Sequence, residues 1–199
     1  MDAIDDAGQI TDASKVVPLE GVEVGRNYAM IISTSCGLWR YMIGDTVRFT
    51  SKRPYKFIIT GRTKSFINAF GEELIVDNAE QGLHYACEKT GAEVREYTAA
   101  PVHRSEGVVP HHQWVIEFAK EPADINEFAR ILDERLQQLN SDYEAKRFKD
   151  INMVRLDLVV ARQGLFHDWL KQKGKLGGQH KVPRLSNSRQ HIDEILAMM

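Results

Sequence analysis

Three short polar segments contain residue types that could bind or activate a phosphate-bearing ligand. They are R-Y-M-I-G-D at 40–45, I-I-T-G-R-T-K at 58–64 and K-G-K-L-G-G-Q-H-K-V-P-R at 173–184. Each lies at a junction between apolar runs, and junctions positioned by a rigid scaffold often carry function. Each also has an ordinary structural explanation, so none of them names a reaction by itself.

Asp45 is the first candidate ligand-binding residue. Its two carboxylate oxygens could accept hydrogen bonds from both hydroxyls of a ribose. The lack of a side chain at Gly44 would let such a ligand approach the backbone closely. A Gly-Asp pair is also ordinary turn chemistry. On spacing alone, a hairpin turn is the favoured interpretation.

Arg62 is the second candidate, at the point where the character of the chain changes. Its planar fork of donors could hold the ribose or phosphate of a nucleotide. A few residues at the end of an element can also absorb the rotation of a hinge. The alternative is a solvated strand end, which the segment alone favours.

Lys181 is the third candidate. Three glycines precede it in a segment that predicts a mobile loop, and Val182-Pro183 stiffens the chain again. A lysine delivered by such a loop could stabilise negative charge that develops on a phosphate or carboxylate. The alternative is a basic surface loop, kept soluble by its lysines.

The histidines 103, 111 and 112 do not predict a metal site. Their spacing fits no common ligand motif, and no cysteine or acidic partner stands at helical spacing beside them. We expect them to lie in a loop before a strand that begins near Trp114.

The elements that would position these residues fall into two groups. Residues 1–15 predict a flexible arm, and 16–62 contain short apolar or alternating runs typical of strands. Hairpins of this length cannot easily bury both faces, so we expect them to belong to a larger sheet or barrel.

After Gly61 the pattern indicates a small α+β domain with an antiparallel, ferredoxin-like sheet and helices. Gly91 is a natural stop for its first helix, and Asp124 with Glu127 predicts the start of a second one. The expected helices cover 76–90, the residues after Asp124, 165–170 and 188–197, and the expected strands cover 93–99, 113–119 and 154–160.

Composition narrows the class of protein. Lys and Arg number 26 against 28 Asp and Glu, a net charge of −2, whereas nucleic-acid binding needs a positive excess. There is no apolar stretch of membrane-spanning length and no secretory signal, so neither a membrane nor export is expected. Cys36 and Cys87 each lie in an apolar run, which predicts two buried free thiols and a cytoplasmic protein.

Four segments occur in an order that points to one family. They are G-L-W-R-Y-M-I-G-D-T-V-R-F, F-I-I-T-G-R-T-K, L-N-S-D-Y-E-A-K-R and G-G-Q-H-K-V-P-R. Together they resemble the auxin-responsive acyl-acid amido synthetases, the hormone-conjugating enzymes of plants and their bacterial relatives within the adenylate-forming superfamily. The resemblance covers about residues 16–199.

The resemblance implies an ATP- and Mg²⁺-dependent ligase. Such an enzyme joins a carboxylic acid to AMP, releases pyrophosphate and passes the acyl group to an amine, usually an amino acid. Asp45 matches the ribose-binding acid, with Tyr41 and Gly44 in its motif. Arg62 matches the nucleotide-contacting arginine, and Lys181 matches the mobile lysine that reaches the α-phosphate or the acyl carboxylate.

The resemblance also implies a division of the chain. Residues 1–62 would be the last strands of a large N-terminal domain, and 63–199 a mobile C-terminal lid that works with that domain. Two departures stand out: the chain has no Ser/Thr/Gly-rich phosphate loop and no acyl-pocket motif, and it has Glu72-Glu73 where plant members have an acidic stretch with a lysine. The rival hypothesis is a free-standing ferredoxin-like module that binds a small regulatory ligand without catalysis.

Overall fold

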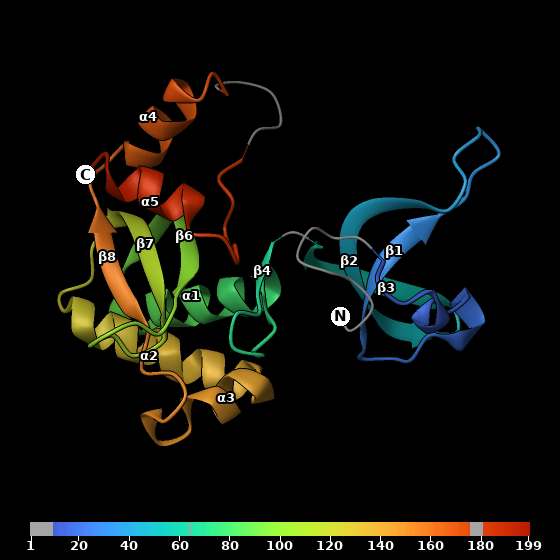
Figure 1. Ribbon diagram of the computed structural model, residues 1–199, viewed down its shortest axis with the longest axis horizontal. Helices are drawn as coiled ribbons and strands as arrows, with labels where there is room; N and C mark the ends of the chain where they lie inside the picture. The colour runs from blue at the N-terminus through green and yellow to red at the C-terminus, as the bar shows by residue number, and fades with distance from the viewer. Residues whose placement is uncertain (1–9, 64, 176–180) are drawn as a thin grey trace. The chain divides into compact units, whose positions relative to one another are not determined.

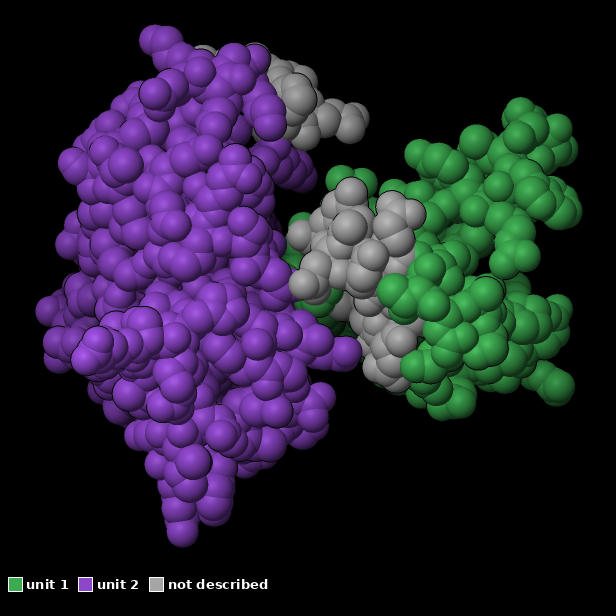
Figure 2. Space-filling model, viewed as in Figure 1, with its two compact units in different colours: residues 1–66, 75–77 green, residues 67–74, 78–199 purple. Residues whose placement is uncertain are grey.

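The computed structural model describes residues 10–63, 65–175 and 181–199. The chain forms two compact units, Met1–Phe66 with Ile75–Asp77, and Ile67–Leu74 with Asn78–Met199 (Figure 2). Residues 1–9 of the expected arm, Lys64 of the expected hinge and 176–180 of the glycine-rich loop lie outside the described residues. Within the described ranges, no helix has both the length and the apolar character needed to cross a membrane.

The first unit is an antiparallel sheet of strands β1 (Asn27–Ile32), β2 (Tyr41–Lys52) and β3 (Tyr55–Arg62), in that spatial order (Figure 1). Two short 3-10 helices precede it, η1 (Ala13–Lys15) and η2 (Leu19–Gly21). Its core is small, built on Val22, Val47 and Phe49. Phe57, Ile58 and Ile59 of β3 are exposed, because three strands alone cover little apolar surface.

The second unit contains a sheet of β6 (Glu93–Val102), β7 (His111–Lys120) and β8 (Asp157–Ala161). β6 and β7 are antiparallel, whereas β8 runs parallel to β7. The expected α+β class is confirmed. The short strands β4 (Phe66–Ile67) and β5 (Leu74–Ile75) lead into α1 (Val76–Thr90), and the later helices are α2 (Ile125–Leu139), α3 (Ser141–Arg147), η3 (Phe148–Asp150), α4 (Leu165–Gln172) and α5 (Gln190–Leu196).

The ends of the first two helices follow the sequence signals. The Asp124 carboxylate accepts from the backbone N–H of Asn126 at 2.8 Å and of Glu127 at 3.2 Å, so it caps α2. Such a cap contributes about 1 kcal/mol. Gly91 stops α1 in a left-handed conformation (φ 68°), with its N–H donating to the Cys87 carbonyl at 2.8 Å.

Strand β7 is buried on both faces. Trp114, Ile116 and Phe118 alternate as expected, and the Phe118 ring meets Phe128 of α2 edge-on at 5.2 Å. Val115 points to the opposite face, where it joins the apolar cluster formed with α4 and α5. Helices therefore cover both faces of this sheet (Figure 1).

Two expectations about individual residues were wrong. His111 and His112 begin β7 instead of lying in a loop, and His112 is fully buried. Cys36 is exposed and Cys87 is half-buried. Cys36 falls in the turn between β1 and β2, where an apolar neighbourhood in sequence brings no burial.

A buried hydrogen-bonded cluster links the segment after β4 to β7 and α3. Glu72 and His112 are both 0% exposed, and His112 Nε2 lies 2.7 Å from Glu72 Oε1. The other carboxylate oxygen accepts from the Phe70 N–H at 2.7 Å. The His112 ring packs between Phe70 and Tyr143. Because Glu72 and His112 are both buried, water cannot replace either side chain as a hydrogen-bond partner when the other is removed.

Candidate functional site

Asp45 and Arg62 are brought together by the pairing of β2 with β3. The two residues are direct cross-strand partners, and Arg62 Nε donates to Asp45 Oδ1 at 3.1 Å. Gly44 and Asp45 lie within β2, so the hairpin-turn interpretation is wrong. The turn was favoured because Gly-Asp is common in turns, but here the strand continues on both sides of the pair.

Gly44 has a conformation that few other residues adopt. Its φ is +85°, in the region that disfavours a side chain. Its carbonyl accepts from the Thr63 N–H at 2.9 Å and from Thr63 Oγ1 at 3.5 Å. The backbone beside Asp45 is therefore fixed by the residue that follows Arg62.

The Asp45–Arg62 pair is open to solvent. Its side chains are 32% and 67% exposed, and an ion pair with this much exposure contributes little stability. A polar ligand could replace the contact at small cost. Both side chains carry groups suited to a nucleotide, hydrogen-bond acceptors on Asp45 and a planar set of donors on Arg62.

Tyr41 lies at the beginning of β2, opposite Ile32 of β1, and is exposed. The structure thus groups Gly44, Asp45 and Arg62 at the β2–β3 pairing, while Tyr41 belongs to the start of the β1–β2 pairing.

Sequence reasoning missed a buried polar row beside Asp45. Thr46 Oγ1 lies 3.0 Å from Thr60 Oγ1, and Thr60 Oγ1 donates to Asn27 Oδ1 at 2.5 Å. Both threonines are buried. The row joins all three strands of the first unit and supports the backbone next to the candidate site. The available signal was a threonine on each of two neighbouring strands, Thr46 directly after Asp45 and Thr60 two residues before Arg62.

Lys181 belongs to the second unit, whereas the other four candidates belong to the first. It is exposed and directly precedes Val182, which is buried in the apolar cluster of α4 and α5. Across the described residues, no group of three or more His, Cys, Asp and Glu side chains could hold a metal ion.

Two domain models of one protein family match this chain. The model of the GH3 family C-terminal domain matches residues 77–190, and that of the GH3 family central domain matches residues 3–62. The chain belongs to the GH3 family. The matched ranges leave residues 63–76 between them.

Curated relatives and solved structures agree with that membership. The chain is 28% identical over 190 residues to the indole-3-acetic acid-amido synthetase GH3.3 of Arabidopsis thaliana, covering 87% of this chain and 31% of that protein. It is 30% identical over 199 residues to the indole-3-acetic acid-amido synthetase GH3.8 of Oryza sativa subsp. indica, covering 91% and 32%. The GH3.15 acyl acid amido synthetase shares the fold, with a TM-score of 0.71 and 22% identity over 92% of this chain and 34% of that one. The chain thus spans about a third of the length of these relatives.

Proposed function

We propose that this chain forms the C-terminal part of an ATP-dependent acyl-acid amido synthetase. The observation that carries the proposal is the solvent-open Asp45–Arg62 pair on adjacent strands in a chain of the GH3 family. In the proposed enzyme, Asp45 binds the ribose hydroxyls of ATP, and Arg62 turns from the carboxylate to the nucleotide. Gly44 leaves room beside them, and Tyr41 lines the start of the same strand.

The proposed reaction has two steps. A carboxylate oxygen of the acid attacks the α-phosphorus of ATP, the bond to the β-phosphate oxygen breaks, and pyrophosphate leaves. An amine, such as that of an amino acid, then attacks the acyl carbon of the adenylate and displaces AMP. Lys181 stabilises the negative charge that builds at the α-phosphate or acyl carboxylate. Mg²⁺, when bound, would neutralise the triphosphate, with ligands expected from the N-terminal domain that partners this chain.

The proposal assigns residues 63–199 the role of a lid that moves against that N-terminal domain. Lys181 then reaches the reacting atoms in one lid position only, so its charge acts on the transition state. Asp45, in contrast, contacts ATP in the ground state and the transition state alike.

The test supplies the missing part from a relative. The portion of rice GH3.8 that precedes the matched region is prepared alone and fused to this chain, and ATP–pyrophosphate exchange is measured with indole-3-acetic acid. We expect exchange from the fusion well above that of the donor portion alone. A fusion that folds, as shown by thermal melting, yet exchanges no faster than the donor portion would contradict the proposal.

Variants of the fusion separate the assigned roles. Lys181→Ala should lower kcat by about 10²-fold with little change in the KM for ATP. Asp45→Ala should mainly raise the KM for ATP, by roughly 10-fold or more. Lys175→Ala removes a lysine from the same basic segment and is the matched control, expected to leave both constants unchanged. If Lys181→Ala behaves like Lys175→Ala, the catalytic assignment is wrong.

A further inference from the structure

The segment Lys181–Asn187, here called the strap, runs along the outer edge of the second sheet. The Ala99 N–H donates to the Arg184 carbonyl at 2.8 Å, and the Ser186 N–H donates to the Ala99 carbonyl at 3.2 Å. Ala99 and Leu185 form a parallel bridge. Since β6 is an edge strand, the strap covers backbone groups that would otherwise face solvent.

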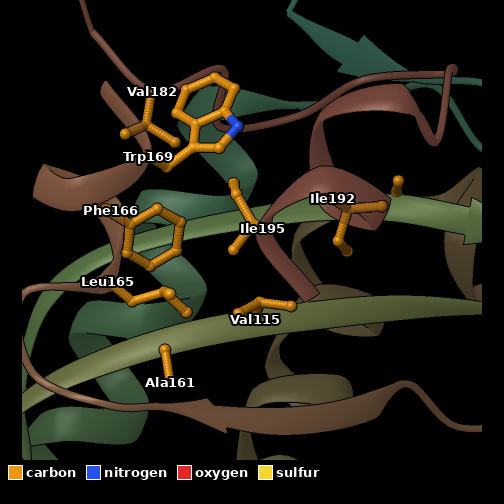
Figure 3. Close-up of a cluster of buried hydrophobic side chains, with 9 residues drawn as sticks. Val115, Ala161, Leu165, Phe166, Trp169, Val182, Ile192 and Ile195 are labelled. Carbon is orange, nitrogen blue, oxygen red and sulfur yellow. The ribbon is translucent and has the colours of Figure 1, made fainter. Parts of the chain in front are cut away.

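Two apolar side chains of the strap, Leu185 and Val182, are buried in the second unit. Leu185 is fully buried, and Val182 lies in the cluster with Phe166, Trp169 and Ile195 (Figure 3). Val182 is the immediate neighbour of Lys181. The backbone at Lys181 is therefore attached to a packed core, although its side chain is exposed.

Thr98 makes a polar contact to the strap two residues beyond Lys181. Its Oγ1 donates to the Pro183 carbonyl at 2.7 Å, and the threonine side chain is buried on β6. A partly buried carbonyl that loses its donor carries a free-energy cost. The Thr98 hydroxyl therefore fixes the backbone of the strap at Pro183, two residues beyond Lys181.

Arg184 adds a second polar anchor. Its guanidinium lies 5.4 Å from the centre of the Tyr97 ring and pairs with Glu80 of α1 and with Glu96, the latter at 3.7 Å. The Tyr97 hydroxyl donates to the same Glu80 carboxylate at 2.8 Å. These contacts connect the strap to both α1 and β6.

Asn187 connects the strap to the chain that follows the first unit. Its Oδ1 accepts from the Asn68 N–H at 2.7 Å. Asn68 Oδ1 in turn accepts from the Glu73 N–H at 3.1 Å. These hydrogen bonds link the strap to the first segment of the second unit. Asn68 and Asn187 are 119 positions apart in the sequence.

We propose that the strap is a rigid mount for Lys181, and that Thr98 is a positioning residue that sets where the lysine is presented. This inference rests on the proposed function, and it assigns catalytic importance to Thr98 through its contact with the strap. Reaction geometry is sensitive to small displacements, since a shift of about 1 Å can cost about 10²-fold in rate. Freeing the Pro183 carbonyl should therefore lower turnover.

The test compares three threonine variants in the fusion enzyme and in the isolated chain. Thr98→Val keeps the shape but removes the donor, and should lower kcat about 10-fold, with the KM for ATP unchanged. Thr98→Ser restores the hydroxyl and should restore kcat. Thr90→Val is the matched control, because Thr90 Oγ1 makes the same kind of bond to the Ala86 carbonyl at 2.8 Å, on α1 and away from the strap; it should leave kcat unchanged.

Hydrogen exchange of the isolated chain gives a readout independent of activity. The Ser186 and Ala99 amides should exchange about 10-fold faster in Thr98→Val than in Thr90→Val or Thr98→Ser. Lys181→Ala separates the two proposals. If Lys181→Ala lowers kcat but Thr98→Val does not, the mount is wrong and the proposed function stands. If Lys181→Ala has no effect, the mount fails together with the catalytic assignment.

Discussion

Replacing Glu72 by alanine should destabilise the second unit strongly. The change removes the only acceptor that His112 Nε2 has within the described cluster and the acceptor of the Phe70 N–H. His112 Nδ1 is already buried without a hydrogen-bond partner, so the ring would be left with no polar contact. Removing one member of a buried pair costs about 3–5 kcal/mol, a large share of the ~5–15 kcal/mol that holds a typical domain folded.

Urea unfolding followed by tryptophan fluorescence measures this loss. Trp114 and Trp169 of the second unit are buried, whereas Trp39 of the first is 81% exposed and should report little. Glu127→Ala is the control, since the Glu127–Arg130 pair lies on the surface of α2 and surface pairs contribute little. A Glu72→Ala midpoint equal to that of Glu127→Ala would refute the argument.

The pH dependence provides a second check with a definite sign. Burial acts to raise the pKa of Glu72, but the hydrogen bond and charge of His112 and the backbone N–H donors outweigh it, and the pKa lies below its ordinary 4.5. A carboxylate with a depressed pKa stabilises the fold above its unfolded pKa, and this contribution is lost as pH falls through the folded value. The difference in unfolding free energy between the parent and Glu72→Gln should therefore shrink as the pH falls below 4.5. A difference that grows in acid would contradict this sign.

Three further predictions concern the isolated chain. It should show no ATP–pyrophosphate exchange with any of a panel of carboxylic acids, because positioning supplies much of such a rate; robust exchange would count against the proposed division of the enzyme. Amides in residues 16–62 should exchange faster than those in β6 and β7, since the first unit has only a small core; equal protection throughout would argue otherwise. Asp133→Ala should lower the melting temperature by roughly 10 °C, because the Asp133 carboxylate accepts from the Tyr143 hydroxyl at 2.7 Å and from Arg147 at 3.0 Å, whereas Asp142→Ala on the surface of α3 should not.

The helices could be predicted because their signals are local. Asp124 caps α2 through donors two and three residues away, and Gly91 ends α1 with a bond to a carbonyl four residues back. The apolar spacing of α2 likewise requires only neighbouring turns. These features are determined by short stretches of sequence, and the predicted bounds of α1 match the observed ones.

Features that depend on distant partners were decided by the tertiary structure. The parallel pairing of β8 with β7 and the burial of His112 against Glu72, 40 residues earlier, have no local signal. The same holds for Gly44-Asp45: despite their turn-like composition they lie within β2, where Asp45 pairs with Arg62 of β3 and the register with β1 is irregular.

For the candidate site, the sequence alone determined which side chains could act, through the residue types at 44, 45, 62 and 181 and their order. It did not determine that Asp45 and Arg62 face each other, or that Lys181 begins a strap fixed by Thr98 and Asn68. Residue type sets the chemistry a side chain can perform, and this is printed in the sequence. Its partners are set by hydrogen bonds and packing between segments far apart in the chain, and these exist only once the chain has folded.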